Sequence, residues 1–164
     1  MSTPIKTHQI RRVAVLGSGV MGSAIACHLA QTGSEVLLLD LPSKEGPRNS
    51  PAEGALKASL KSKPAPLYSK RFVKRIECGN FDDDLSRIAE CDWIIEVIVE
   101  RLDIKQQLFE RVEKYRKPGT LITSNTSGIP ISQLSEGRSE DFQKHFCGTH
   151  FFNPPRYLQL LEII

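Results

Sequence analysis

The sequence predicts an α/β fold in which a doubly wound, mainly parallel β-sheet carries helices on both faces. Two observations predict it. Short apolar segments typical of buried strands alternate with segments of helical periodicity along most of the 164 residues. A glycine-rich turn, residues 17–22 (GSGVMG), directly follows the first apolar segment and opens the first helical one. Because parallel strands need crossover connections, this alternation favours a parallel sheet.

The first unit comprises a strand, a turn and a helix. Residues 13–16 (VAVL) are apolar and rich in β-branched side chains, as expected of a buried strand. The turn fits the pattern G-x-G-x-x-G, in which each glycine has a separate physical role. Gly17 permits a tight turn, Gly19 leaves room for a phosphate near the backbone, and Gly22 allows close packing of the helix. Helical spacing then continues through residues 24–30.

A second apolar strand, residues 35–39, ends in Asp40, 23 positions after Gly17. A carboxylate at this distance is expected to bind ribose hydroxyls of a dinucleotide and to repel a 2′-phosphate. The pyrophosphate would lie at the helix N-terminus, near Val20 and Met21. The pattern therefore predicts a Rossmann-type domain that binds NAD rather than NADP. The alternative is a glycine-rich turn in another α/β protein, with Asp40 as a cap.

The remaining elements continue this alternation. A loop rich in Pro, Gly and Ser follows the second strand, and Pro51 is placed to open the next helix. Three consecutive aspartates, residues 82–84, are expected to cap a short helix. By number, the predicted helices span 51–63, 82–89, 102–117 and 131–134, and the predicted strands span 72–77, 92–99, 121–123, 146–152 and 157–164.

Composition and charge exclude several classes of protein. With 22 basic and 19 acidic residues, the net charge of +3 is too small to indicate a nucleic-acid partner. No apolar run approaches the roughly 20 residues needed to span a membrane. Residues 1–11 form a polar lead-in without the apolar core of a secretory signal. Four scattered cysteines without C-x-x-C spacing favour reduced thiols in a cytoplasmic protein, and nothing indicates a metal site.

The middle of the chain is basic. Lys57, Lys61 and Lys63 lie on or next to the predicted helix 51–63, and further lysines and arginines follow within residues 70–75. One interpretation is a solvated helical face. The other is a site for a phosphorylated substrate, because ammonium groups pair well with phosphates.

Three separated parts of the chain carry a resemblance to a known family. They read GSGVMGSAIA (17–26), IIEVIVERLDIKQQLFERV (94–112), and SNTSGIPI (124–131) followed by GTHFFNPPRYLQLLEII (148–164). Their sequence and order resemble the NAD-binding domain of the L-3-hydroxyacyl-CoA dehydrogenases. In detail they are most similar to the bacterial proteins of fatty-acid β-oxidation that join this dehydrogenase to an enoyl-CoA hydratase. The resemblance implies NAD-dependent oxidation of an L-3-hydroxyacyl-CoA to a 3-ketoacyl-CoA.

The resemblance also implies a catalytic pair. His150 matches the family's catalytic histidine, and Glu162 matches its carboxylate partner. Ser127 matches a serine that contacts the substrate's 3-oxygen and the cofactor, and Asn153 is expected to orient groups of the site. These residue types suit the reaction, since oxidising a secondary alcohol requires a base for its proton. Histidine titrates near neutral pH, and a carboxylate partner sets its tautomer.

Further contacts follow from the same resemblance. Glu100 and Lys105 match positions that line the nicotinamide end of the cofactor. Ser59 matches a serine that contacts coenzyme A, with Lys61 and Lys63 close enough in sequence to assist. The expected partners are therefore NAD and an acyl-CoA substrate.

Two features depart from the family. Gly128 stands where the family's SNTSS loop has its second serine. The family's all-α C-terminal domain, which covers the acyl-CoA, does not follow, and the chain ends inside an apolar run. We therefore expect residues 1–164 to be one domain, truncated before the helical domain of a longer parent chain. We also expect the apolar end, residues 158–164, to promote self-association into a homo-oligomer.

Two other functions stay open on the sequence alone. The chain could be a non-catalytic NAD-binding or assembly module. It could also be a sibling dehydrogenase that acts on a short hydroxyacyl-CoA or a free hydroxy acid. The intact pair of His150 and Glu162 favours a catalytic parent protein.

Overall fold

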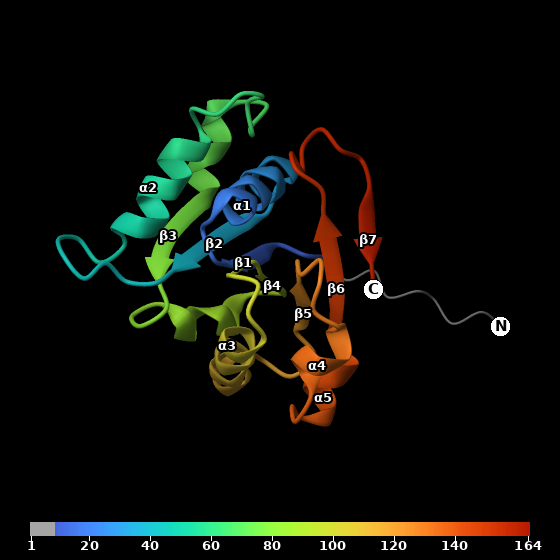
Figure 1. The fold of residues 1–164 in the computed structure, drawn as a ribbon. Coiled ribbons are helices and arrows are strands. Elements are labelled where there is room, and N and C mark those ends of the chain that lie inside the picture. The colour runs from blue at the N-terminus through green and yellow to red at the C-terminus, as the bar shows by residue number, and fades with distance from the viewer. Residues whose placement is uncertain (1–8) are drawn as a thin grey trace.

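The computed structural model describes residues 9–164, so residues 1–8 of the predicted lead-in lie outside the described residues. Within the described part, seven strands form one sheet in the order β3-β2-β1-β4-β5-β6-β7 (Figure 1). The pairs from β3 to β6 are parallel and β7 is antiparallel, which confirms the doubly wound, mainly parallel prediction. The strands are β1 (Arg12–Leu16), β2 (Glu35–Asp40), β3 (Ile76–Asn80), β4 (Trp93–Glu96), β5 (Leu121–Ser124), β6 (Phe146–Phe151) and β7 (Leu161–Ile163).

Helices cover both faces of the sheet (Figure 1). One face carries the helices α1 (Val20–Thr32) and α2 (Ser50–Ser59) and the 3₁₀ helix η1 (Lys70–Arg75). The other carries the 3₁₀ helix η2 (Leu85–Glu90) and the helices α3 (Leu102–Tyr115), α4 (Ile131–Ser135) and α5 (Glu140–Lys144).

Strand β1 divides the core between these two faces. Val13 and Val15 pack under α1, whereas Ala14 and Leu16 pack against η2 and α3. All four side chains are fully buried. This division follows from the strand itself, because successive side chains point to opposite faces of a sheet.

The predicted strand over residues 72–77 is wrong for most of its length. Residues up to Arg75 form η1, and β3 begins only at Ile76. Phe72 and Val73 are adjacent in sequence, yet both pack against the apolar cluster under α1. Adjacent side chains of a strand cannot do this, since they point to opposite faces, whereas a helical turn allows it.

Two other predicted strands are too long. Residues 92–99 contribute only Trp93–Glu96, because the Glu96 carboxylate accepts a hydrogen bond from Ile98 N (2.8 Å) and the chain turns away. Residues 157–164 contribute only Leu161–Ile163, because the N–H groups of Tyr157 and Leu158 bond to the Pro154 carbonyl in a turn.

Two predicted helices are also corrected. The helix over residues 51–63 ends at Ser59, where bonds of the i→i−3 type replace the helical ones. The helix over residues 82–89 is the 3₁₀ helix η2, and no aspartate side chain caps it. Asp84 stands at the cap position, but its carboxylate accepts from Asn80 N (3.0 Å) instead.

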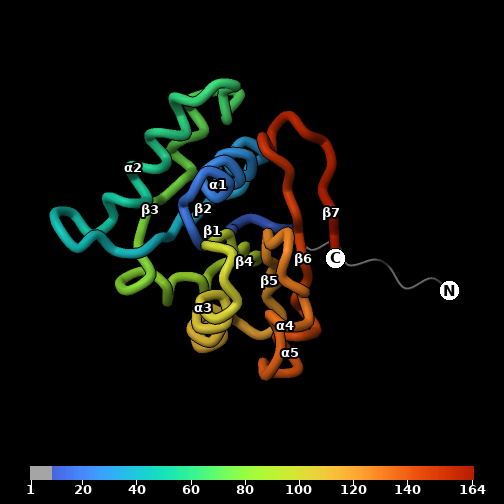
Figure 2. Tube along the Cα trace, viewed as in Figure 1, coloured from blue at the N-terminus to red at the C-terminus, as the bar shows by residue number. Residues whose placement is uncertain are grey.

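The C-terminal hairpin lies at the edge of the sheet opposite β3 and α2 (Figure 2). Its apolar side chains within residues 158–164 are exposed, as predicted, at Leu158, Leu160, Leu161, Ile163 and Ile164. Self-association through this edge stays a prediction. No helix among residues 9–164 has the length and apolar character that crossing a membrane requires.

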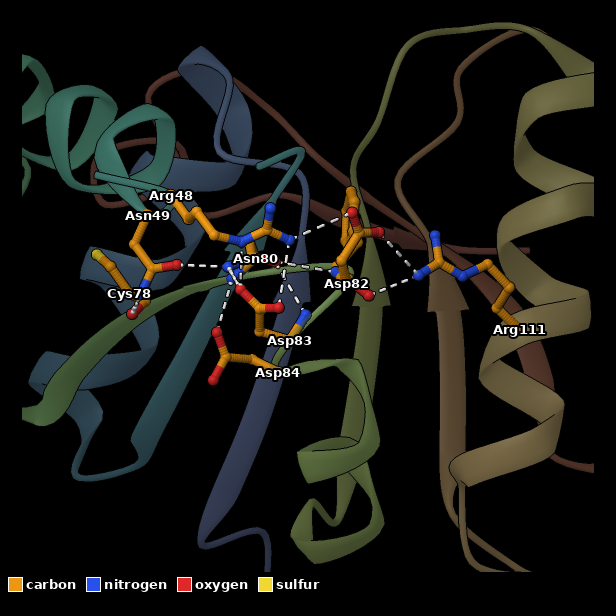
Figure 3. A network of polar contacts seen from close by, with 9 residues as sticks. Arg48, Asn49, Cys78, Asn80, Asp82, Asp83, Asp84 and Arg111 are labelled. Carbon is orange, nitrogen blue, oxygen red and sulfur yellow. Dashed lines mark hydrogen bonds and ion pairs between the residues drawn. The ribbon is translucent and has the colours of Figure 1, made fainter. Parts of the chain in front are cut away.

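A polar network joins the carboxyl end of β3 to the start of α2 (Figure 3). Asn80 is at its centre and is 1% exposed. Its amide nitrogen donates to Asn49 Oδ1 (2.6 Å) and Asp83 Oδ2 (2.9 Å), and its amide oxygen accepts from Asp82 N and Asp83 N (3.0 Å each). Arg48 adds an exposed ion pair with Asp83 (2.6 Å). Asn80 therefore sets the loop that follows β3.

Replacing Asn80 by Ala should lower the free energy of unfolding by about 1–3 kcal/mol, because the hydrogen bonds of this buried amide to Asn49, Asp82 and Asp83 are lost. Urea denaturation monitored by circular dichroism measures this change. Arg48→Ala is the control, since an exposed ion pair contributes little. Equal shifts of the urea midpoint in the two variants would contradict the central role of Asn80.

Candidate functional site

The glycine-rich turn connects β1 to α1 at the carboxyl edge of the sheet. Gly17 has a φ of 108°, and a Cβ there would lie 2.6 Å from the Val97 carbonyl oxygen. A Cβ on Gly22 would lie 1.9 Å from the Gly17 carbonyl oxygen, so only glycine allows α1 to approach the turn this closely. Gly19 differs from both. Nothing lies within 4 Å of its Cβ position, which leaves this backbone open to a ligand.

The first turn of α1 presents free N–H groups beside Gly19. The first i→i−4 bond runs from Ser23 N to Gly19 O (2.9 Å). The N–H groups of Val20, Met21 and Gly22 therefore have no partner within the helix. Free N–H groups and the positive end of the helix dipole together suit a pyrophosphate.

Asp40 ends β2 next to this turn. Its Oδ2 accepts from Ser18 N (2.7 Å) and from the Ser18 hydroxyl, and its Oδ1 accepts from Leu41 N (2.7 Å). A carboxylate offers about four acceptor directions, so ribose hydroxyls can still bind. The open backbone at Gly19 and the acceptors of Asp40 together fit NAD.

A cleft of about 500 Å³ lies between α1, α2 and the turn that follows β6. The glycine-rich turn contributes Gly19 and Val20 to its lining, and the predicted substrate residues Ser59, Lys63 and Asn153 line it as well. The structure thus brings these predicted residues into one cleft. Lys61, also predicted, is exposed and does not line it.

Arg156 closes one side of this cleft and was not predicted from the sequence. Its Nη1 donates to the carbonyl oxygens of Ala65 (2.8 Å) and Leu67 (3.3 Å). These bonds join the turn after β6 to the segment between α2 and η1. No pattern in the sequence indicates this contact, because its partners are backbone groups.

His150 and Glu162 meet across the hairpin of β6 and β7. The strand register places them directly opposite each other, and His150 Nδ1 lies 2.8 Å from Glu162 Oε2. The His150 side chain is 23% exposed and its ring packs against Phe152, with centroids 4.7 Å apart. When the carboxylate accepts from Nδ1–H, the Nε2 atom is left free to exchange a proton.

Ser127 is exposed in the loop after β5, and Glu100 holds this loop. Glu100 Oε1 accepts from Ser127 N (3.2 Å), Gly128 N (3.1 Å) and the Thr126 hydroxyl. Burial by itself would raise the pKa of Glu100. Hydrogen bonds from Thr126 and Gly128 and the ammonium group of Lys105 outweigh burial and lower the pKa below its ordinary value of 4.5.

Lys105 is buried, with 1% of its side chain exposed. Its Nζ lies 2.6 Å from Glu96 Oε1 and 3.3 Å from Glu100 Oε2, so it faces carboxylates rather than open cleft. Its predicted place at the nicotinamide end of the cofactor stays a prediction. Glu96 was not predicted as a site residue. The sequence feature that could have identified Glu96 is a charged residue inside the apolar run 92–99. A carboxylate buried in such a strand needs a charged or hydrogen-bonding partner.

Comparison with known proteins decides the family. Residues 12–164 match the family model described as "3-hydroxyacyl-CoA dehydrogenase, NAD binding domain". The chain belongs to this family. The predicted resemblance is confirmed, and NAD is confirmed as the cofactor of this type of domain.

Relatives of this chain include much longer proteins. A probable 3-hydroxyacyl-CoA dehydrogenase of Bacillus subtilis is 49% identical over 94% of this chain and 22% of the relative. A putative fatty acid oxidation complex trifunctional enzyme of Rickettsia felis is 44% identical over 96% of this chain and 22% of the relative. The crystal structure of Escherichia coli 3-hydroxybutyryl-CoA dehydrogenase has a TM-score of 0.78 at 32% identity, covering 95% of this chain and 32% of that one. The chain thus spans a third or less of these proteins.

Gly22→Ala should destabilise the domain by about 1–3 kcal/mol, because the added Cβ must displace the Gly17 carbonyl. NADH affinity should fall with it, since the turn and the helix N-terminus shift. Gly54→Ala is the matched control, because its Cβ on α2 meets nothing within 4 Å. The control should be neutral or stabilising by up to about 1 kcal/mol. Thermal unfolding and NADH fluorescence measure both effects, and a neutral Gly22→Ala would contradict the close approach.

The pH dependence of stability should report Glu100. Its pKa is lowered in the folded state, so its stabilising contribution is fully present above pH 4.5 and is lost as the pH falls through the folded pKa. The difference in Tm between wild type and Glu100→Gln should therefore shrink below about pH 4.5. Glu110→Gln, an exposed change on the neighbouring helix α3, should give no such trend. A constant difference for Glu100→Gln down to pH 3 would contradict this assignment.

Proposed function

We propose that this chain is the NAD-binding and proton-transferring part of an L-3-hydroxyacyl-CoA dehydrogenase, which oxidises its substrate to a 3-ketoacyl-CoA. The pair of His150 and Glu162, 2.8 Å apart, carries the proposal. His150 lies near the carboxyl end of β6, at the same edge of the sheet as the glycine-rich turn and Asp40. The family match and the names of the relatives support the same reaction.

The chain's own residues supply the proton chemistry. The backbone at Gly19, the first turn of α1 and the Asp40 carboxylate would hold NAD, which would supply the acceptor for the hydride on C3 of the substrate. His150 Nε2 accepts the proton of the 3-hydroxyl group, and Glu162 stabilises the imidazolium ion that forms. The Ser127 hydroxyl would hydrogen-bond to the reacting oxygen, and Asn153, which lines the cleft, would orient groups of the site. In the reverse direction His150 returns the proton.

The cleft suits a coenzyme A thioester. Its volume of about 500 Å³ is in the usual range for small-molecule sites. Alanine and proline side chains give it apolar walls at Ala55, Ala58 and Pro64, and Lys63 adds an ammonium group for phosphates. Ser59 lies on the same wall.

We further propose that other domains of a longer parent chain complete the acyl-CoA site. This is supported by relatives of which the chain spans only 22%. The cytoplasmic location and the homo-oligomer stay predictions.

His150→Ala should leave NADH binding nearly unchanged and should lower NADH oxidation by acetoacetyl-CoA by about 10²–10⁴-fold. NADH fluorescence measures binding, and absorbance at 340 nm measures oxidation. His145→Ala is the control, since that histidine bonds to the Asp141 carbonyl at the far end of β6.

The outcomes separate the candidate functions. Turnover that depends on His150 supports the dehydrogenase. NADH binding without turnover in the wild type favours a cofactor-binding part that needs the other domains proposed for the parent chain. A chain that does not bind NADH contradicts the proposed function.

A further inference from the structure

Glu96 is a completely buried carboxylate at the carboxyl end of β4, with 0% of its surface exposed. Its Oε1 accepts from Lys105 Nζ (2.6 Å) and from Ile98 N (2.8 Å). Its Oε2 accepts from the Ser124 hydroxyl at the end of β5. The carboxylate thus joins two neighbouring strands and α3 at the edge of the sheet that holds the site.

Three charged groups share this place. The Lys105 ammonium lies between the carboxylates of Glu96 (2.6 Å) and Glu100 (3.3 Å). Removing charged groups from water costs about as much free energy as their mutual attraction provides. The cluster therefore adds little net stability to the fold. A fixed geometry at a functional site is the better explanation for it.

The loop after β5 depends on Glu96 at several points. The backbone carbonyl of Glu96 accepts from Asn125 N (2.9 Å). The carboxylate of Glu96 accepts from the Ser124 hydroxyl, and that hydroxyl accepts from Thr126 N (3.3 Å). Glu100, paired with Lys105, accepts from Ser127 N and Gly128 N of the same loop.

The same loop reaches the strand of the catalytic pair. Asn125 Oδ1 accepts from Phe151 N (2.8 Å), and Phe151 follows His150 directly. The position of Ser127 relative to His150 is therefore set through this loop.

We propose that Glu96 is a positioning residue for the nicotinamide half of the cofactor. It fixes Lys105, Lys105 keeps Glu100 in place, and Glu100 holds the loop that carries Ser127. This inference rests on the proposed function for the direction of the cofactor. With the adenosine ribose at Asp40 and the pyrophosphate at the N-terminus of α1, the nicotinamide half of the dinucleotide would extend toward β4 and β5.

The charge of Glu96 is what matters in this arrangement. Glutamine at this position has the same size, but it leaves Lys105 with Glu100 as its nearest carboxylate. Without the competing charge of Glu96, the Lys105 ammonium attracts the Glu100 carboxylate more strongly. Glu100 is then drawn away from the N–H groups of Ser127 and Gly128. The adenosine end, at Asp40 and Gly19, contains none of these groups.

The decisive experiment compares Glu96→Gln with wild type in binding two ligands, NADH and ADP-ribose, which lacks the nicotinamide. Fluorescence titration gives the Kd of NADH, and calorimetry gives that of ADP-ribose. We expect NADH to bind at least tenfold more weakly and ADP-ribose to change less than twofold. Glu113→Gln is the control, because Glu113 lies on α3, the helix that carries Lys105, and its carboxylate accepts from Ser139 N (2.9 Å) rather than from any group of the Ser127 loop. It should change neither Kd.

A second measurement needs no ligand. Hydrogen exchange of the amides at Thr126, Ser127 and Gly128 should accelerate at least tenfold in Glu96→Gln, with Ser139 unchanged.

Should Glu96→Gln fail to fold, the double variant Glu96→Leu/Lys105→Met removes both charges together. Proteins often tolerate the replacement of a whole buried ion pair by apolar side chains. The double variant should also lower the NADH affinity selectively and speed the exchange at Ser127 and Gly128, because Glu100 then loses the ammonium group that keeps it in place.

The results separate the two proposals. Equal weakening of NADH and ADP-ribose, or unchanged exchange at Ser127 and Gly128, would overturn the positioning role while the proposed function stands. Wild type that binds neither ligand would overturn the proposed function, and the exchange rates would still decide whether Glu96 holds the loop.

Discussion

The contact between α1 and the turn after β1 is the constraint on which the rest of the site depends. With no side chain on Gly22, the helix begins against the Gly17 carbonyl and aims its free N–H groups over the carboxyl edge of the sheet. This direction sets the place of a pyrophosphate. Because the strands from β1 to β6 are parallel, their carboxyl ends bring Asp40, the Ser127 loop and His150 to that same edge.

Different interactions shape the loops on the two sides of this edge. On the side of β2 and β3, hydrogen bonds of Asn80 and exposed ion pairs of Arg48 shape the loops (Figure 3). On the side of β4 and β5, buried charges do so, with Lys105 between Glu96 and Glu100. Buried charges hold their geometry more strictly than exposed pairs, since water competes less for them.

The chain reverses direction after β6, and the antiparallel pairing of β6 with β7 brings Glu162 to His150. An antiparallel partner places residues of neighbouring strands directly opposite each other. Glu162 therefore faces His150 across the hairpin, although twelve positions separate them in the chain. The same hairpin exposes Leu158 and Ile163 at the open edge of the sheet.

The sequence by itself determined the fold class, the glycine-rich turn and the pair of His150 and Glu162, because local patterns and family motifs encode them. It did not determine η1, where Phe72 and Val73 follow the packing surface of α1 rather than their own alternation. Only the tertiary structure decided that Lys105 is enclosed by carboxylates and that Glu96 organises the Ser127 loop. Burial and partner choice depend on which strands become neighbours, and no local pattern in the chain records that arrangement.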